Sequence, residues 1–166
     1  MAVVGLVHID LSSGIVEIAS AISDDGIPIR FADDVAISND GKVYFSDASR
    51  VSPWIDKSGY FNPKLAAVLD AALGSGTGRL LVYDPADRST TTLMKDLLFA
   101  NGVAMSPDFD FVLVCESFGY RVTRLWLEGG RKGTVDYFSS RLPGFPDNIR
   151  RAPGGGYWLA INAKVS

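Results

Sequence analysis

One short motif occurs three times along the 166 residues of this chain, and its repetition constrains the fold more than any other feature. Each copy opens on Asp or Asn, continues into aliphatic residues, crosses a turn and enters an aromatic or β-branched run. The three copies, called entry motifs below, begin at Asp33-Asp34, Asn101-Gly102 and Asp147-Asn148. Such a repeat is typical of stacked structural units, and it puts a carboxylate or carboxamide at an equivalent place in each unit.

A second pair of strand-like runs follows each of the first two entry motifs. Runs 79–84 and 89–94 are separated by an Asp-Pro turn, and runs 121–127 and 135–138 by a turn that contains two glycines. Two inner and two outer antiparallel strands per unit make up a β-propeller blade. The sequence therefore predicts an all-β fold of the β-propeller class.

The number of these units predicts how the chain is organised. Residues 1–166 are expected to form a partial propeller, with the outer strands of one blade, about two further blades and the start of the next inner pair. Propellers close with about four to eight blades, so we expect about half of a ring. Open blade edges predict either a fragment of a longer protein or self-association through those edges.

Residues 52–77 interrupt the first full unit and are predicted to be an insertion within a blade. A helix is expected over about residues 62–74, because Asn62 suits a helix N-cap, Pro63 the first turn and Gly74 the end. Four apolar residues share one face of this helix: Leu65, Val68, Leu69 and Ala72. We expect the helix to cross one end of the sheet, as a lid or as a packing surface.

Charge and composition exclude several classes of partner. The net charge is −3 and the pI is about 5.0, so nothing favours nucleic acid or an anionic membrane surface. No apolar run approaches the roughly 18–20 residues of a membrane span. A small-molecule substrate is the expected partner. The single cysteine, Cys115, is predicted to be a buried strand thiol, and the single histidine, His8, to be structural.

Four longer stretches carry a resemblance to a known family: residues 77–85, 98–106, 124–129 and 142–149. They are similar to the strictosidine synthase-like family, of the adipocyte plasma membrane-associated protein and hemomucin type, and the match runs from about Phe31 onward. This family lies within the superfamily of paraoxonase-like and gluconolactonase-like propellers. The resemblance implies a six-bladed β-propeller, and it implies the secretory pathway or the endomembranes as the location.

The entry motifs supply a candidate metal site. Equivalent positions before the inner strands of a propeller converge on its central channel, where carboxylate and carboxamide oxygens suit Ca²⁺. The resemblance to paraoxonase-like enzymes implies the ligands Asp33, Asn101, Asp147 and Asn148, with Asp33 at a position often held by Asn. A further ligand of those enzymes, a Glu from an early blade, has no counterpart here. The alternative is that these residues are turn formers and side-chain caps at strand entries.

The resemblance implies a metal-dependent hydrolase of esters or lactones, of arylesterase type, in which the metal polarises a carbonyl and activates a water. Asp147 and Asp34 are the candidate catalytic carboxylates, as ligand or base. Other functions stay open: an amine–aldehyde condensation of the strictosidine synthase type, which needs a Glu from a late blade, a non-catalytic binding scaffold, or an inactive truncated fragment.

Two further polar pairs have a simpler expected role. Glu116-Ser117 can face the rim of the channel, but a hydrogen bond at the blade edge is the favoured interpretation. Arg150-Arg151 is expected to be solvated or paired with neighbouring carboxylates.

Overall fold

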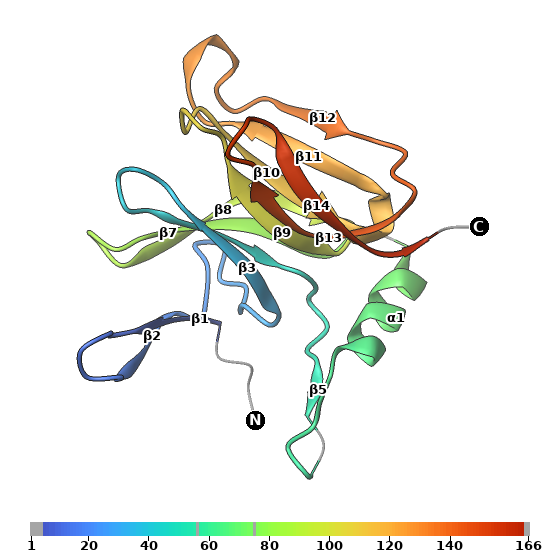
Figure 1. The fold of residues 1–166 in the computed structure, drawn as a ribbon. Helices are drawn as coiled ribbons and strands as arrows, with labels where there is room; N and C mark the ends of the chain where they lie inside the picture. The colour runs from blue at the N-terminus through green and yellow to red at the C-terminus, as the bar shows by residue number, and fades with distance from the viewer. Residues whose placement is uncertain (1–4, 56, 75, 165–166) are drawn as a thin grey trace.

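The computed structural model describes residues 5–55, 57–74 and 76–164, which are mostly β-strand (Figure 1). Two four-stranded antiparallel sheets form the centre. The first sheet has the order β3 (Ala32–Ile37), β4 (Val43–Asp47), β7 (Gly78–Asp84) and β8 (Ser89–Leu97). The second has the order β9 (Ala100–Met105), β10 (Phe111–Glu116), β11 (Arg121–Trp126) and β12 (Val135–Ser139). The predicted all-β fold with four-stranded units is confirmed.

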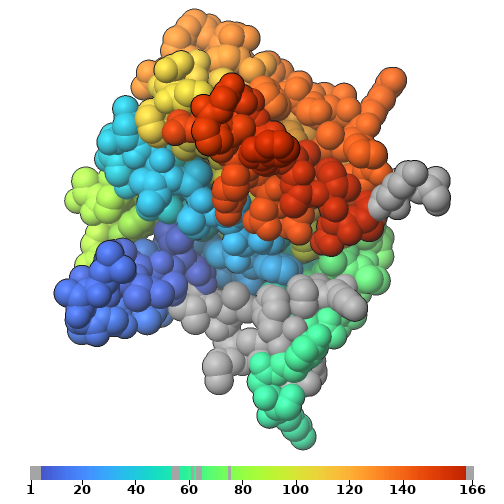
Figure 2. All heavy atoms as spheres, viewed as in Figure 1, coloured from blue at the N-terminus to red at the C-terminus, as the bar shows by residue number. Residues whose placement is uncertain are grey.

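Two antiparallel pairs flank these sheets. Strand β1 (Leu6–Ile9) pairs with β2 (Val16–Ser20), and this hairpin projects from one side of the molecule (Figure 2). Strand β13 (Gly144–Arg151) pairs with β14 (Tyr157–Lys164) and packs on the second sheet. Short 3₁₀ turns follow β10 and β11, at Ser117–Gly119 and Gly129–Arg131.

A Ser and an Asp fix the turn between the first two strands of each sheet. In the first sheet the Ser38 hydroxyl donates to the Asp40 carboxylate, and Gly41 takes a φ of +83°, a region that favours glycine. In the second sheet the Ser106 hydroxyl donates to Asp110 at 2.7 Å. These bonds hold each turn locally, which explains why the sequence places Ser and Asp after the aliphatic part of the entry motif.

The hydrophobic core lies between successive sheets, and β10 shows how one strand serves two cores. Val112 and Val114 are buried in the cluster shared with the first sheet. Leu113 and Cys115 alternate with them and are buried in the cluster shared with Ile149 of β13. Adjacent residues of a strand face opposite sides of its sheet, so a strand covered on both faces is apolar at every position.

Cys115 is buried in this core, as predicted. Burial, together with the nearby carboxylates of Asp34 and Asp147, raises the pKa of its thiol to about 12. A thiol with such a pKa stays protonated at neutral pH and is a poor nucleophile.

The predicted inserted helix is present as α1 (Pro63–Leu73), one residue shorter at each end than expected. With the short strands β5 (Trp54–Ile55) and β6 (Phe61–Asn62), it lies in the chain between β4 and β7 and outside the two large sheets (Figure 1). Within the described ranges, no helix has both the length and the apolar character that crossing a bilayer requires.

The apolar face defined by the helical spacing points to solvent. Leu65 is 49% exposed and Val68 is 64% exposed, whereas Ala66 and Asp70 are buried. The Asp70 carboxylate accepts a hydrogen bond from the Ser49 hydroxyl at 2.8 Å and so attaches the helix to the end of β4. A small residue and a hydrogen-bonded acid, rather than the leucines, therefore hold the helix against the sheet.

A buried ion pair crosses the first sheet. Arg79 at the start of β7 and Asp47 at the end of β4 are register partners, and both side chains are fully buried. Arg79 donates to Asp47 Oδ2 from Nη2 at 2.6 Å and from Nε at 3.1 Å. Asp47 Oδ1 accepts the backbone N–H groups of Arg30 and Phe31, at 3.1 and 2.8 Å. The pair therefore fixes the chain where it enters β3.

The second sheet carries the same arrangement. Glu116 at the end of β10 and Arg121 at the start of β11 are register partners, joined by two hydrogen bonds of 2.8 Å. Glu116 Oε2 accepts the Leu98 N–H at 2.9 Å, just before β9. Burial alone would raise the pKa of Glu116, but these hydrogen bonds and one from the Thr123 hydroxyl hold it below its usual range.

Removing the cation of the buried pair should leave an unpaired charge in the core. We expect Arg79→Leu to lower the free energy of unfolding by about 3–5 kcal/mol, measured by urea denaturation. Lys95→Met removes a half-exposed lysine paired with Asp25 at 2.9 Å, and should cost at most about 1 kcal/mol. Equal costs for the two variants would show that the Arg79 pair does not hold the sheet.

Candidate polar site at the inner-strand entries

The residues of the entry motifs lie at or near the starts of β3, β9 and β13, called the inner strands below. Asp33 and Asn101 are each the second residue of their strand, and Asp147 and Asn148 lie within β13. The three inner strands run next to one another (Figure 1). The four predicted ligands, Asp33, Asn101, Asp147 and Asn148, are called the polar site.

Gly102 brings the second and third entry motifs together. A Cβ at this position would stand 2.5 Å from the Asp147 carbonyl oxygen and 2.6 Å from the Ile149 nitrogen. Such distances are below van der Waals contact, so only glycine allows the backbones of β9 and β13 to approach this closely. The glycine therefore places Asn101 beside the Asp147-Asn148 segment.

Two carboxylates interact within the polar site. The Asp33 side chain is open to solvent on one side. Partial removal of the Asp33 carboxylate from water raises its pKa to about 6, and the nearby negative charges of Asp147 and Asp34 contribute to this rise. Asp147 is half-buried, and its Oδ1 accepts a hydrogen bond of 3.3 Å from Asn148. Negative charge therefore accumulates here, and among the described residues no cation forms an ion pair with Asp33.

Asn101 contributes a buried oxygen without a partner. Its side chain is 8% exposed, and its Nδ2 donates to the Ser117 hydroxyl at 3.3 Å. Its Oδ1 has no hydrogen-bond partner among the described residues. Leaving such an atom unpaired costs about 1–3 kcal/mol, and a carboxamide oxygen is a ligand that Ca²⁺ accepts.

Asp34 lies next to Asp33 in the chain but, unlike Asp33, is buried. It accepts two hydrogen bonds from the guanidinium of Arg150 on β13, at 2.7 and 2.9 Å. It also accepts the backbone N–H of Val103 on β9, at 2.9 Å. Asp34 thus joins all three inner strands, and the expected pairing of Arg150 with a carboxylate is confirmed. These contacts favour a structural role for Asp34, and its role as a base stays a prediction.

The donor set decides which metal would fit. No group of three or more His, Cys, Asp or Glu side chains able to hold a metal is found in the part of the chain that the structure describes. The polar site instead combines two carboxylates with two carboxamides. Such an all-oxygen set suits a hard cation such as Ca²⁺ and does not suit zinc or copper.

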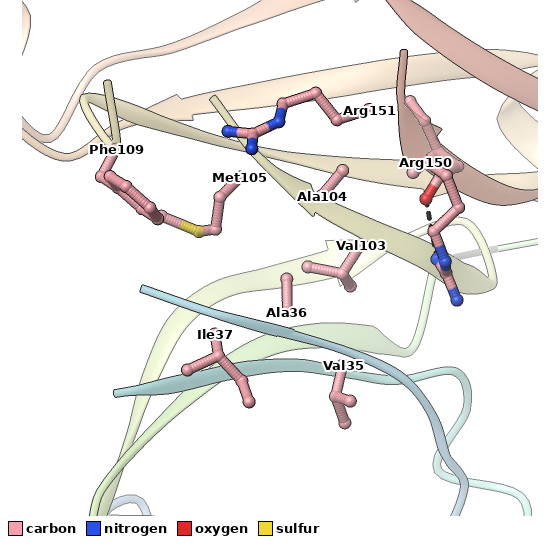
Figure 3. A pocket seen from close by; sticks show the side chains of 10 residues that line it. Val35, Ala36, Ile37, Val103, Ala104, Met105, Phe109, Arg150 and Arg151 are labelled. Carbon is pink, nitrogen blue, oxygen red and sulfur yellow. Dashed lines mark hydrogen bonds between the residues drawn. The ribbon is translucent and has the colours of Figure 1, made fainter. Parts of the chain in front are cut away.

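A hollow of about 290 Å³ lies between the inner strands (Figure 3). Val35, Ile37, Val103 and Met105 give it an apolar lining, and Arg151 lies at its edge (Figure 3). A second hollow, of about 520 Å³, separates the β1–β2 hairpin from the first sheet and includes the exposed His8. Neither of the two is lined by the predicted ligands.

The sequence interpretation missed the role of the arginines. In each of the two large sheets, the second strand ends with an acid that pairs with an Arg among the first two residues of the third strand: Asp47 with Arg79, and Glu116 with Arg121. Aligning the repeats beyond the entry motif would have revealed this pattern. For Glu116-Ser117, the expected hydrogen bonds at the blade edge are confirmed.

Comparison with known proteins places the chain in a family. The family model described as strictosidine synthase matches residues 33–130. Adipocyte plasma membrane-associated protein of Salmo salar is 42% identical over 139 residues, which cover 83% of this chain and 31% of that protein. The strictosidine synthase-like protein 3 of Arabidopsis thaliana is 36% identical, with 83% and 33% covered. The chain belongs to the strictosidine synthase-like family, and it spans about a third of the length of these curated relatives.

Solved structures show the same fold. A gluconolactonase of Xanthomonas campestris has a TM-score of 0.69 at 20% identity, with 95% of this chain and 49% of that chain covered. Regucalcin of Agrobacterium tumefaciens, described as a calcium-binding protein, has a TM-score of 0.63 at 18% identity, with 95% and 47% covered. The predicted β-propeller is confirmed, and this chain corresponds to about half of the ring.

Substituting Gly102 should separate β9 from β13. We expect Gly102→Ala to destabilise the protein by about 1–3 kcal/mol or more, because the atoms that its methyl group would meet belong to the backbone. Gly154→Ala is the control, since a methyl group there meets nothing within 4 Å and should change stability by less than about 0.5 kcal/mol. Equal thermal midpoints for both variants would contradict the close approach of the two strands.

The raised pKa of Asp33 has a consequence for stability in the absence of metal. Because the folded protein binds this proton more tightly than the unfolded chain, the contribution of Asp33 is favourable at low pH and is lost as the pH rises through about 6. Asp33→Asn should therefore gain stability relative to wild type between pH 5 and pH 7.5, measured by urea unfolding with a chelator. Asp108→Asn, in an exposed turn, is the control, and a pH-independent difference for Asp33→Asn would contradict the prediction.

Proposed function

We propose that this chain belongs to a metal-dependent hydrolase of lactones or esters, with Ca²⁺ held at the polar site. The observation that carries the proposal is the buried Asn101 Oδ1, which has no partner among the described residues and belongs to β9, the strand that contacts those of the interacting carboxylates Asp33 and Asp147. A hard cation at this place would give the amide oxygen a ligand bond and would neutralise the charge at Asp33 and Asp147.

Each residue of the polar site has a role in this proposal. Asp33 and Asp147 supply carboxylate oxygens, and Asn101 and Asn148 supply carboxamide oxygens. A bound Ca²⁺ would polarise the carbonyl of an ester or lactone and favour attack by water. Asp147, half-buried and hydrogen-bonded only weakly to Asn148, is the carboxylate we propose to orient that water. Asp34 holds the inner strands in place through Arg150.

The comparisons support this proposal in outline. Two of the solved propellers are described as gluconolactonases and a third as calcium-binding, although identities of 18–21% carry the fold alone. The hollow between the same three inner strands offers space for the carbon skeleton of a small substrate. No observation in the described residues favours amine–aldehyde condensation or a purely scaffolding role, and both serve as alternative outcomes of the test.

Calcium binding tests the proposal directly. Calorimetric titration of the chain with Ca²⁺ should show binding, and Asn101→Ala or Asp147→Asn should weaken it at least about 10-fold. The Asp108→Asn variant, which removes an exposed carboxylate outside the site, should bind like wild type. Hydrolysis of a lactone and an aryl ester is measured on the same samples, and activity should depend on Ca²⁺.

Two results would count against the proposal. Absence of both Ca²⁺ binding and hydrolysis would favour a scaffold or an inactive fragment. If Asn101→Ala and Asp147→Asn lower stability, measured as the thermal midpoint, without changing Ca²⁺ affinity, these residues act as strand caps.

A further inference from the structure

We propose that Ser117 is a positioning residue, which orients the Asn101 carboxamide and ties it to the strand that carries Asp147. The inference deepens the proposed function, since the oriented oxygen is the proposed metal ligand. Ser117 follows β10 directly and is 5% exposed. Its hydroxyl contacts Asn101 Nδ2 at 3.3 Å and the Pro146 carbonyl oxygen at 2.7 Å.

The direction of these two hydrogen bonds follows from proton counting. A serine hydroxyl has one proton, and the Pro146 carbonyl can only accept, so that proton is used at Pro146. In the hydrogen bond with Asn101, the carboxamide must then be the donor. This requires the amide nitrogen of Asn101, and not its oxygen, to face Ser117. The Asn101 oxygen is therefore turned away from Ser117 and left without a partner among the described residues.

The backbone on both sides holds the Ser117 hydroxyl in place. The Ser117 N–H donates to the Phe99 carbonyl at 3.1 Å, while the preceding Glu116 accepts the Leu98 N–H at 2.9 Å. Arg121 fixes the Glu116 carboxylate in turn. The hydroxyl is thus anchored to the segment that enters β9, and it reaches Pro146, the residue immediately before Asp147.

The first sheet provides an internal comparison. Ala48 follows β4 as Ser117 follows β10, and its N–H donates to the Phe31 carbonyl at 2.8 Å in the same way. The backbone arrangement therefore needs no hydroxyl. The hydroxyl of Ser117 is therefore free to bind Asn101 and the Pro146 carbonyl. The first sheet has no such hydroxyl, and its ligand candidate Asp33 is more exposed than Asn101.

The experiment compares Ser117→Ala with Ser106→Ala, which removes an equally buried hydroxyl at the other end of the same sheet. Calorimetric titration of the chain with Ca²⁺ should show a 10–100-fold weaker affinity for Ser117→Ala, about the effect of losing a group that orients a metal ligand. Ser106→Ala should bind like wild type. Unchanged Ca²⁺ affinity in Ser117→Ala would overturn the proposal.

A second measurement needs no metal. In the metal-free protein, the side-chain amide signals of Asn101 should shift in the nitrogen–proton correlation spectrum of Ser117→Ala and show exchange between orientations. They should stay at the wild-type positions in Ser106→Ala. If wild type binds no Ca²⁺, the proposed function fails, and this spectrum alone decides whether Ser117 orients Asn101. Unchanged Asn101 signals in Ser117→Ala would refute the positioning role.

Discussion

The carboxylate of Asp34 is the contact on which the polar site depends. It lies on β3, accepts the Val103 N–H of β9 and forms a double hydrogen bond with Arg150 of β13. Arg150 is 116 residues away in the sequence, so this one side chain fixes strands that turns and loops alone would not align. The three inner strands, and the ligand candidates on them, are held together because losing a partner of the buried Asp34 carboxylate would leave an uncompensated charge in the protein, which is strongly destabilising.

Within each large sheet, an ion pair between an acid and an arginine fixes neighbouring strands, as Asp34 fixes the strands of different units. Asp47 and Glu116 accept backbone N–H groups from the segments that enter β3 and β9. These segments are therefore held by hydrogen bonds, whereas the polar site has, among the described residues, an Asn101 oxygen without a partner and an Asp33 of raised pKa. Stable surroundings around unsatisfied groups are what a binding site for a cation requires.

Much of the fold could be predicted because the signals are local. Aromatic and β-branched runs predict the strands, turn residues such as Asp-Pro and glycine predict the hairpins, and the N-cap, Pro63 and Gly74 place the helix within one residue of its observed ends. The packing side of that helix could not be predicted, since Leu65 and Val68 are exposed while Asp70 is buried. Its position depends on a hydrogen bond from Asp70 to Ser49, 21 positions earlier in the chain, and no local pattern reveals such a contact.

The sequence by itself determined the repeated units and the polar residue that begins each of them. Only the tertiary structure decided which of two adjacent aspartates is buried and paired with an arginine and which stays exposed. Asp33 is exposed and Asp34 is buried, at a place where the pairing of β3 with β4 shifts register between Ala32 and Val35, so regular alternation along the strand could not have assigned the two positions. The side that stays open is set by how β9 and β13 pack against β3, and that packing joins residues too far apart in the chain for any local pattern to encode.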